Sequence, residues 1–130
     1  MTILRAVRHV PATVHELSRI GLLASLPGEL LNKLAARMTR EEVAAGAAIV
    51  RQGEEGDRFY VVLSGMLNVT QEPIGDRRIL RPGDYFGEVA LAMHIARTAS
   101  VRAVTPAVVA SCDQETFDEL LRPLFAADDE

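Results

Sequence analysis

The spacing of apolar residues divides the chain into three segments, and the first, residues 1–39, is predicted to be helical. Thr13 and Glu16 fit the Ser/Thr-x-x-Glu capping box, in which each side chain satisfies a free backbone donor at a helix start. Gly21 is expected to end this helix. Ser25 is expected to cap a second helix, whose apolar residues recur every three or four positions and predict one buried stripe: Leu30, Leu31, Leu34, Ala35 and Met38.

The apolar pattern changes between residues 40 and 113, where short runs rich in β-forming residues are separated by turns. The runs are AAIVRQ, RFYVVLS, MLNVTQ, RRIL, TASVRAV and AVVASC. Apolar residues occupy both alternating sets in RFYVVLS, so both faces of this strand are predicted to be buried. Ser64–Gly65 and the PIGD sequence are predicted turns, the first of them a tight hairpin. Such a series of short strands predicts an antiparallel sandwich or roll.

The third segment, residues 114–130, is predicted to be helical again. Asp113 is a favourable N-cap for a helix through QETFDELL. Pro123 can open a further helix but cannot lie in the middle of one. Together the three segments predict a single α+β domain that is mainly β, with helices before and after the strands.

Composition restricts the class of protein. The 130 residues suffice for one domain, and 48% apolar with 25% charged residues is typical of a globular chain. No apolar run approaches the roughly 20 residues of a membrane-spanning helix, and the N-terminal sequence does not resemble a signal peptide. The net charge of −4 argues against general attraction to nucleic acid or anionic lipid. Cys112 is the only cysteine, which excludes an internal disulfide, favours a reducing, cytoplasmic setting and predicts an inert core thiol.

The segment FGEVALAMHIARTASV, residues 86–101, combines the features of an anion site. Gly87 precedes a short apolar helix, where a glycine lets a ligand approach backbone N–H groups closely. Arg97 can bind phosphate oxygens through two parallel hydrogen bonds. Glu88 would repel a phosphate, so it fits this site only if its carboxylate accepts a hydrogen bond from a hydroxyl of the ligand. A ligand with both a phosphate and a hydroxyl indicates a nucleotide. The alternative is that Arg97 and Glu88 form a structural ion pair.

The residues FGEVAL, five further residues and RTASV resemble the phosphate-binding cassette of the cyclic nucleotide-binding domain family. The upstream GAAIVRQGEEGDRFYVVLSGMLNV resembles that family's early strands and its Gly-x-x-Gly-Asp turn. The ending RTASVRAVTPAVVASCDQETFDELL is similar to the domain in cyclic nucleotide-gated channels. The resemblance covers about residues 22–121. It implies an eight-stranded antiparallel β-roll, flanked by helices, that binds cAMP or cGMP without a cofactor or metal.

The resemblance also implies roles for individual residues. Backbone N–H groups from Gly87 to Leu91 would bind the cyclic phosphate, and Arg97 would pair with its exocyclic oxygens. Glu88 would accept the ribose 2′-OH, and Thr98 with Ala99 would complete the phosphate contact. Val69 and Leu80 fall where the family lines its base pocket. The expected ligand-binding residues are therefore Val69, Leu80, Phe86, Gly87, Glu88, Val89, Ala90, Leu91, Arg97, Thr98 and Ala99.

The predicted function is regulatory rather than enzymatic: a sensor whose flanking helices transmit ligand occupancy to an attached effector or partner protein. The long C-terminal helix that covers the base in signalling members is expected to be either short or truncated here, and no residues remain in this sequence for a helix-turn-helix. Nucleic-acid binding by this chain alone and direct membrane insertion are therefore not expected, while a homodimer stays open. The alternative function is a ligand-free domain of the same fold used for oligomerisation or docking. A metal enzyme with a similar roll needs a His-x-His constellation, which His9, His15 and His94 do not provide.

Overall fold

The structure, a computed structural model, describes residues 10–126. The elements in chain order are α1 (Val14–Ser18), the 3₁₀ turn η1 (Gly21–Leu23), α2 (Gly28–Arg37), β1 (Thr39–Val43), β2 (Ala48–Val50), β3 (Arg58–Ser64), β4 (Leu67–Gln71), β5 (Gly75–Leu80), β6 (Tyr85–Phe86), α3 (Glu88–Met93), β7 (Ser100–Ala103), β8 (Ala107–Asp113), α4 (Gln114–Thr116), the π-helical turn η2 (Phe117–Leu121) and α5 (Arg122–Ala126). Residues 1–9 of the first predicted segment and 127–130 of the third lie outside the described residues.

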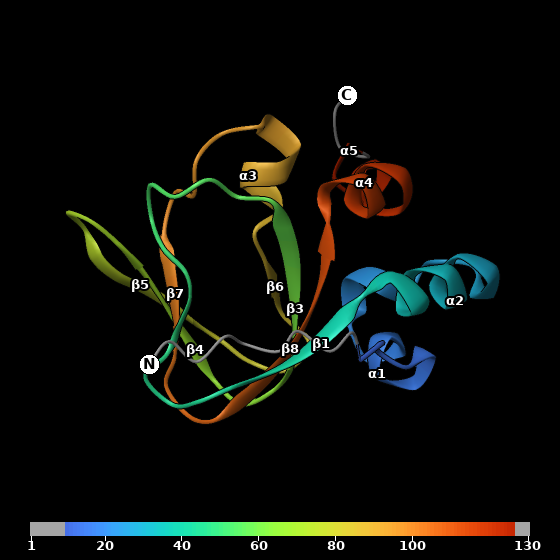
Figure 1. Cartoon of the computed structure of the whole chain (residues 1–130), viewed down its shortest axis with the longest axis horizontal. Coiled ribbons are helices and arrows are strands. Elements are labelled where there is room, and N and C mark those ends of the chain that lie inside the picture. Colours follow the sequence, from blue (N-terminus) through green and yellow to red (C-terminus); the bar gives the residue numbers. More distant parts are fainter. Residues whose placement is uncertain (1–9, 127–130) are drawn as a thin grey trace, which may run out of the picture.

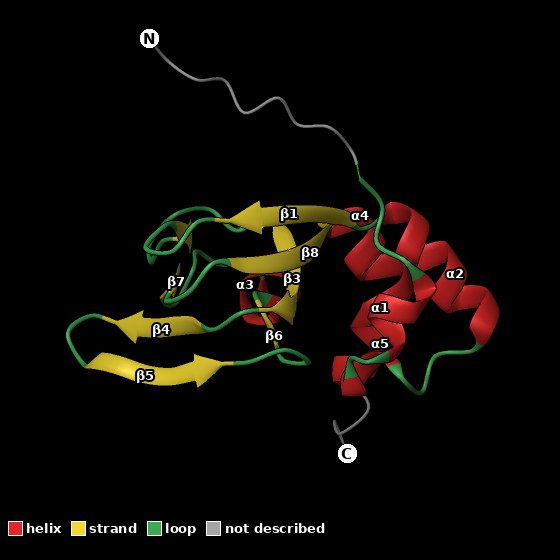
Figure 2. Ribbon diagram, turned by 90° about the horizontal axis from the view of Figure 1, so that it is seen from below, coloured by secondary structure: helices red, strands yellow, loops and turns green. Residues whose placement is uncertain are grey.

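The strands form two four-stranded antiparallel sheets, with strand orders β1-β8-β3-β6 and β2-β7-β4-β5. The helices α1 and α2 gather with the C-terminal helices at one end of the molecule, and the β4–β5 hairpin extends at the other (Figure 2). Helix α3 lies between β6 and β7 in the chain, beside the strands and near the C-terminal helices (Figure 1). This arrangement confirms the predicted mainly-β antiparallel fold with eight strands and flanking helices.

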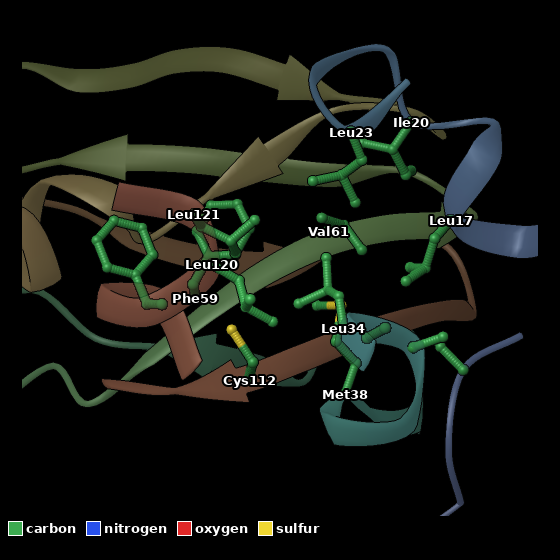
Figure 3. Packing of buried hydrophobic residues seen from close by; sticks show 14 of the residues in the cluster. Leu17, Ile20, Leu23, Leu34, Met38, Phe59, Val61, Cys112, Leu120 and Leu121 are labelled. Atoms are coloured by element: carbon green, nitrogen blue, oxygen red, sulfur yellow. The ribbon is translucent and has the colours of Figure 1, made fainter. Parts of the chain in front are cut away.

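Strand β3 separates two hydrophobic clusters, as the apolar residues on both of its faces predict. Phe59 and Val61 face the helices, in a cluster that we call the helical core and that Figure 3 shows. Tyr60 and Val62 face the interior between the sheets, in a cluster that we call the roll core. Buried members of the helical core include Leu17, Ile20, Leu23, Leu34, Met38, Phe59, Val61, Cys112, Phe117 and Leu121. Buried members of the roll core include Val43, Val50, Tyr60, Val62, Leu67, Leu80, Phe86, Val101 and Val109.

The predicted capping box is present at the start of α1. The Thr13 hydroxyl accepts a hydrogen bond from the Glu16 backbone N–H at 3.1 Å, and the Glu16 carboxylate accepts one from the Thr13 N–H at 3.0 Å. The helix ends at Ser18, however, before the predicted stop at Gly21. Gly21 instead begins the 3₁₀ turn η1, because the chain makes one further short turn before it changes direction.

Helix α2 begins later than predicted. Its N-cap is Pro27, which provides no side-chain cap, so the prediction of a Ser25 cap is wrong. Proline has a fixed φ that suits a helix start, and this local restraint outweighs the capping preference of a nearby serine. The predicted apolar stripe packs into the helical core, except that Leu30 is 37% exposed.

Of the two predicted turns in the roll, one joins paired strands and the other does not, and two strands were not predicted. The PIGD turn is confirmed as the β4–β5 hairpin. The Ser64–Gly65 hairpin is wrong, because β3 and β4 belong to different sheets and this turn carries the chain from one sheet to the other. Strands β1 and β6 were not predicted as separate runs, since β1 reads TREEV and β6 has two residues.

The C-terminal helices pack into the helical core. Asp113 caps α4 as predicted, since its carboxylate accepts a hydrogen bond from the Thr116 N–H at 2.9 Å. Phe125 of α5 packs against Phe59, Tyr85 and Phe117, with ring centroids 5.9, 5.5 and 5.6 Å away. Among residues 10–126, no helix has the length and apolar content needed to cross a membrane.

Candidate ligand site

Helix α3 begins at a point where backbone and arginine side chain meet closely. Gly87, its N-cap, has a φ of +95°, in the left-handed region that glycine adopts readily. A Cβ at this position would lie 2.8 Å from Arg97 Nη1 and 2.9 Å from the Arg58 carbonyl oxygen. Both the conformation and the space therefore require glycine here.

Arg97 is buried beside this helix start, and within the described part of the chain it forms no ion pair with a carboxylate. Its side chain is 6% exposed, and Nη2 donates to Arg58 O at 2.7 Å while Nη1 donates to Gly87 O at 3.3 Å. The guanidinium carbon lies 5.9 Å from the centroid of the Tyr60 ring. Burial lowers the pKa of the Arg97 guanidinium below its usual value. Both hydrogen-bond acceptors of this poorly solvated cation are neutral carbonyls, and the Asp57 carboxylate acts on it without an ion-pair contact, which favours the approach of an anion.

The alternative of a structural ion pair between Arg97 and Glu88 is not what the structure contains. Both residues are described, and no ion pair joins them. The half-buried Glu88 side chain lies at the cleft next to α3. Glu88 and Arg97 therefore remain available to separate parts of one ligand.

The loop between β2 and β3 positions Arg97 from the other side. The Gly53 N–H donates to Arg97 O at 2.9 Å, and the Arg97 N–H donates to Glu54 O at 2.8 Å. A Cβ at Gly56 would lie 2.8 Å from both Arg97 Nε and Ala90 Cβ. The predicted Gly-x-x-Gly turn thus lies against the guanidinium and leaves room for it.

A cleft of about 160 Å³ opens beside α3 and Arg97. One wall is a row across the second sheet, in which Val50 pairs with Val101, Val101 with Val69, and Val69 with Arg78. Residues directly opposite one another in a sheet share a face, so this row presents three valines and one arginine to the cleft. The other lining residues are Phe86, Gly87, Glu88, Val89, Ala90, Arg97, Thr98 and Ala99.

The structure brings together all but two of the predicted ligand-binding residues at this cleft. Leu80 is fully buried in the roll core, two residues along β5 from Arg78, and does not line the cleft. Leu91 is fully buried in the helical core. Their predicted contacts with a ligand, like those of the residues that do line the cleft, stay predictions.

Three lining residues were not predicted from the sequence: Val50, Arg78 and Val101. Their strands were recognised, but membership of the row depends on which residues pair across β2, β7, β4 and β5. Strand pairing among non-adjacent segments is not encoded in the alternation within one strand. A charged residue within the RRIL run, whose neighbours also face solvent, carries no signal that marks it as part of a cleft.

Cys112, the single cysteine, takes no part in this site. It lies fully buried in the helical core, and burial raises the pKa of its thiol to about 12. A thiol that stays protonated is a poor nucleophile, in agreement with its predicted role as core.

The sequence model of the cyclic nucleotide-binding domain family matches residues 40–123, well over half of the chain. The chain belongs to the cyclic nucleotide-binding domain family. A cGMP-dependent protein kinase, egl-4, from Caenorhabditis briggsae is 38% identical over 85% of this chain and 16% of the relative. A cAMP-dependent protein kinase regulatory subunit from Yarrowia lipolytica is 40% identical over 83% of this chain and 29% of the relative. The chain thus spans less than a third of the length of these two relatives.

A solved structure agrees with these sequence matches. The regulatory domain of Toxoplasma gondii PKA, crystallised with cAMP, superposes with a TM-score of 0.80 at 32% identity, over 85% of this chain and 44% of that chain. In the cyclic nucleotide-binding domain described here, residues 86–90 and 97–99 form the wall of the cleft that carries both Glu88 and Arg97.

Proposed function

We propose that this domain binds a cyclic nucleotide, cAMP or cGMP, in the cleft beside α3 and that occupancy regulates an attached effector or partner. The observation that carries the proposal is the buried Arg97 guanidinium, which donates to two carbonyl oxygens and forms no ion pair with a carboxylate of residues 10–126. A cyclic phosphate supplies one negative charge with two exocyclic oxygens, which suits a planar guanidinium. The match to the family and the cAMP-bound relative from Toxoplasma gondii support this ligand class.

The proposed ligand contacts follow the lining of the cleft. Arg97 and the backbone N–H groups at the start of α3 would hold the phosphate, with Thr98 and Ala99 beside it. Glu88 would accept a hydrogen bond from the ribose 2′-OH, since a carboxylate is an acceptor only. The base would then lie against the valine row that ends at Arg78.

The regulatory part of the proposal rests on the relatives, which are named as a kinase regulatory subunit and as a cyclic-nucleotide-dependent kinase. We propose that this domain acts as a non-catalytic sensor in a cytoplasmic setting, with a protein partner read through its helices.

Titration calorimetry of the full chain with cAMP, cGMP and linear 5′-AMP tests the proposal. We expect saturable one-site binding of at least one cyclic nucleotide and weaker binding of 5′-AMP. Arg97→Ala should cost about 2–5 kcal/mol of binding free energy, roughly 30- to several-thousand-fold in affinity, because a desolvated charge partner is lost. Circular dichroism should show that the roll remains folded.

The matched control is Arg102→Ala, which removes an exposed arginine of β7, the strand that follows Arg97 in the chain; its Nη1 donates to Gly46 O at 2.6 Å. This variant should keep the affinity of the unaltered chain. If the unaltered chain binds no cyclic nucleotide, the alternative of a ligand-free docking domain takes its place. If Arg97→Ala and Arg102→Ala bind equally, the site assignment is wrong.

A further inference from the structure

A second hollow, larger than the cleft beside α3, lies between α1 and the roll. Its volume is about 310 Å³, against about 160 Å³ for the cleft. Among residues 10–126, none lines both hollows, so a ligand here needs none of the residues proposed to bind a cyclic nucleotide. We call this hollow the α1 pocket; its lining includes His15, Arg19, Arg40, Leu63, Gly83 and Val108.

The turn between β5 and β6 brings the roll close to the end of α1. The Asp84 N–H donates to Arg81 O at 2.9 Å, and the two residues between them are Pro82 and Gly83. Gly83 has a φ of +100°, which fits the third residue of a type II turn, and proline suits the second position. A Cβ added at Gly83 would lie 3.8 Å from the Arg19 carbonyl oxygen. This turn therefore forms one wall of the α1 pocket, next to the residue that follows α1.

Positive charge predominates among the side chains that line the α1 pocket, although the whole chain has a net charge of −4. Arg40 Nε donates to Glu16 Oε2 at 2.9 Å, and Glu16 Oε1 accepts the Thr13 N–H at 3.0 Å. Burial alone would raise the pKa of Glu16, but the hydrogen bonds from Thr13 and Arg40 lower it below its usual value. The carboxylate is therefore charged at neutral pH, and it faces two arginines, Arg19 and Arg40.

Several donors of the α1 pocket have no partner within residues 10–126. The Nη1 and Nη2 atoms of Arg40 make no hydrogen bond there, and neither do the side chains of Arg19 and His15. Arg19 and His15 are exposed, and the Arg40 side chain is 35% exposed, so a ligand can reach all three. Two N–H groups of one guanidinium lie parallel and match two oxygens of a carboxylate or phosphate. These donors therefore suit an oxyanion.

The rest of the lining is mostly apolar. Ile20 and Val62 are fully buried, Leu63 and Val108 are half-buried, and Pro82 belongs to the β5–β6 turn. A bare inorganic anion would leave this surface in contact with water. Pockets for small molecules combine apolar walls with a few polar groups and have volumes of roughly 300 Å³ or more. The α1 pocket has both properties.

We propose that the α1 pocket binds a small organic anion, a carboxylate or phosphate carried on an apolar body. Arg40 binds the oxyanion through Nη1 and Nη2, Arg19 adds a second positive charge, and the apolar body lies against Leu63 and Val108. This site takes a different ligand class from the cleft and does not rest on the proposed function, because no residue of the cleft takes part.

Titration of the isotope-labelled full chain with phenyl phosphate and with benzoate, followed by backbone amide chemical shifts, tests the proposal. Chemical shifts report where a probe binds as well as how tightly. At least one probe should give saturable shifts at residues 15–20, 62–64 and 82–84. Benzyl alcohol, which lacks the charge, and inorganic phosphate, which lacks the ring, should each bind roughly tenfold more weakly, since each keeps only one kind of contact.

Two variants test the arginines. Arg19→Gln removes a positive charge from an exposed side chain and should weaken the tighter probe about threefold to fivefold. Arg40→Lys keeps the charge but loses the parallel pair of donors, and should weaken it about tenfold. The matched control is Arg77→Gln, which removes an exposed arginine that lines neither hollow and should keep the affinity of the unaltered chain. Circular dichroism of each variant checks that the chain remains folded.

The outcomes decide between a specific site and general attraction. Absence of saturable shifts around the α1 pocket with both probes, or shifts confined to residues 86–99, overturns the proposal. Equal losses of affinity in Arg19→Gln and Arg77→Gln also overturn it, because the attraction would then depend on net charge alone. Inorganic phosphate that binds as tightly as phenyl phosphate shows that the apolar wall takes no part and overturns the assigned ligand class.

Discussion

The helical core and the roll core share strand β3 but are built from different residues and serve different ends. The helical core is rich in leucine and phenylalanine, whereas the roll core contains mainly valine and alanine with two stacked rings, Tyr60 and Phe86, whose centroids are 4.8 Å apart. Val50, Phe86 and Val101 belong to the roll core and also line the cleft. The helical core holds the segments that are proposed to respond to a ligand.

The two cores also differ in how their elements are tied together. Around the roll core, backbone hydrogen bonds join each strand to its neighbours in two antiparallel ladders. Around the helical core, the helices are joined to the roll and to one another largely by side chains, such as the contacts of Lys33 and Arg37 with Glu119. Side-chain packing can rearrange without breaking a ladder, so movement is expected in the helices and not in the cleft wall.

The largest expected effect comes from truncating one phenylalanine in each core. Phe59→Ala removes a fully buried ring that contacts Tyr85, Phe117 and Phe125, and should lower the free energy of unfolding by about 3–5 kcal/mol. Phe86→Ala should cost a similar amount and should in addition weaken ligand binding, because Phe86 lines the cleft. Urea denaturation and calorimetric titration measure the two quantities separately.

The binding affinities of Phe59→Ala and Phe86→Ala test whether the two cores differ in function. Phe59→Ala should lose clearly less affinity than Phe86→Ala once the folded fraction is taken into account. Equal losses of affinity would mean that ligand binding depends on both cores alike, and not mainly on the roll core.

The sequence predicted the roll more completely than the helices because strand alternation and turn residues are local signals. The RFYVVLS run predicted that both faces of one strand would be buried, and the two faces pack into separate clusters. The predicted helix end at Gly21 and the predicted helix start at Ser25 were wrong. At these positions Pro27 and tertiary packing outweigh capping preferences. The prediction of a hairpin at Ser64–Gly65 was wrong because a turn between two sheets and a hairpin turn within one sheet use the same residue types.

The candidate site divides in the same way. Residues 86–99 were predicted as a group because they are contiguous and carry recognisable spacing. The valine row and Arg78 were not, because they come together only through pairing of four separate strands. Likewise, no sequence feature of Arg122 indicates that its Nη1 donates to Ala92 O of α3, since Arg122 follows the π-helical turn η2.

A smaller effect is expected from Gly56, where the β2–β3 loop meets both Arg97 and α3. Gly56→Ala places a methyl group 2.8 Å from Arg97 Nε and Ala90 Cβ, so the guanidinium or α3 must shift. Such overpacking costs about 1–3 kcal/mol, and we expect roughly tenfold weaker cyclic nucleotide binding. Gly28→Ala is the control, because no atom lies within 4 Å of its added Cβ. Equal titration curves for the two variants would show that Arg97 does not need this space.

Glu88→Gln is expected to cost about 1–2 kcal/mol of binding free energy, since it keeps an acceptor oxygen but removes the charge. A 2′-deoxy ligand gives the sharper measurement. It should bind the unaltered chain weakly and lose little more on mutation, because the hydroxyl that Glu88 is proposed to bind is already missing. If the losses of binding free energy from Glu88→Gln and from removal of the 2′-OH simply add, Glu88 does not contact that hydroxyl.

The smallest expected effect concerns the choice between guanine and adenine, and it involves the polar end of the valine row. Arg78 lies opposite Val69, is exposed, and lines the cleft wall against which the base is proposed to lie. Guanine presents two acceptors, O6 and N7, which an arginine can bind together, whereas adenine presents N7 beside an amino donor. Arg78 should therefore favour cGMP over cAMP.

Arg78→Ala should weaken cGMP binding by about 1 kcal/mol, the low end for an arginine–guanine contact because this side chain is exposed, and cAMP binding by less. Arg77→Ala is the matched control: it removes the same charge from the adjacent exposed residue, which does not line the cleft. Titrations of both variants with both nucleotides in one buffer separate a specific contact from general electrostatic attraction. If Arg77→Ala and Arg78→Ala weaken cGMP equally, the effect is one of net charge. If Arg78→Ala alone weakens cGMP and cAMP equally, Arg78 contacts a part of the ligand that the two nucleotides share. Only a selective loss of cGMP in Arg78→Ala shows that the roll core, through the end of its valine row, distinguishes the two bases.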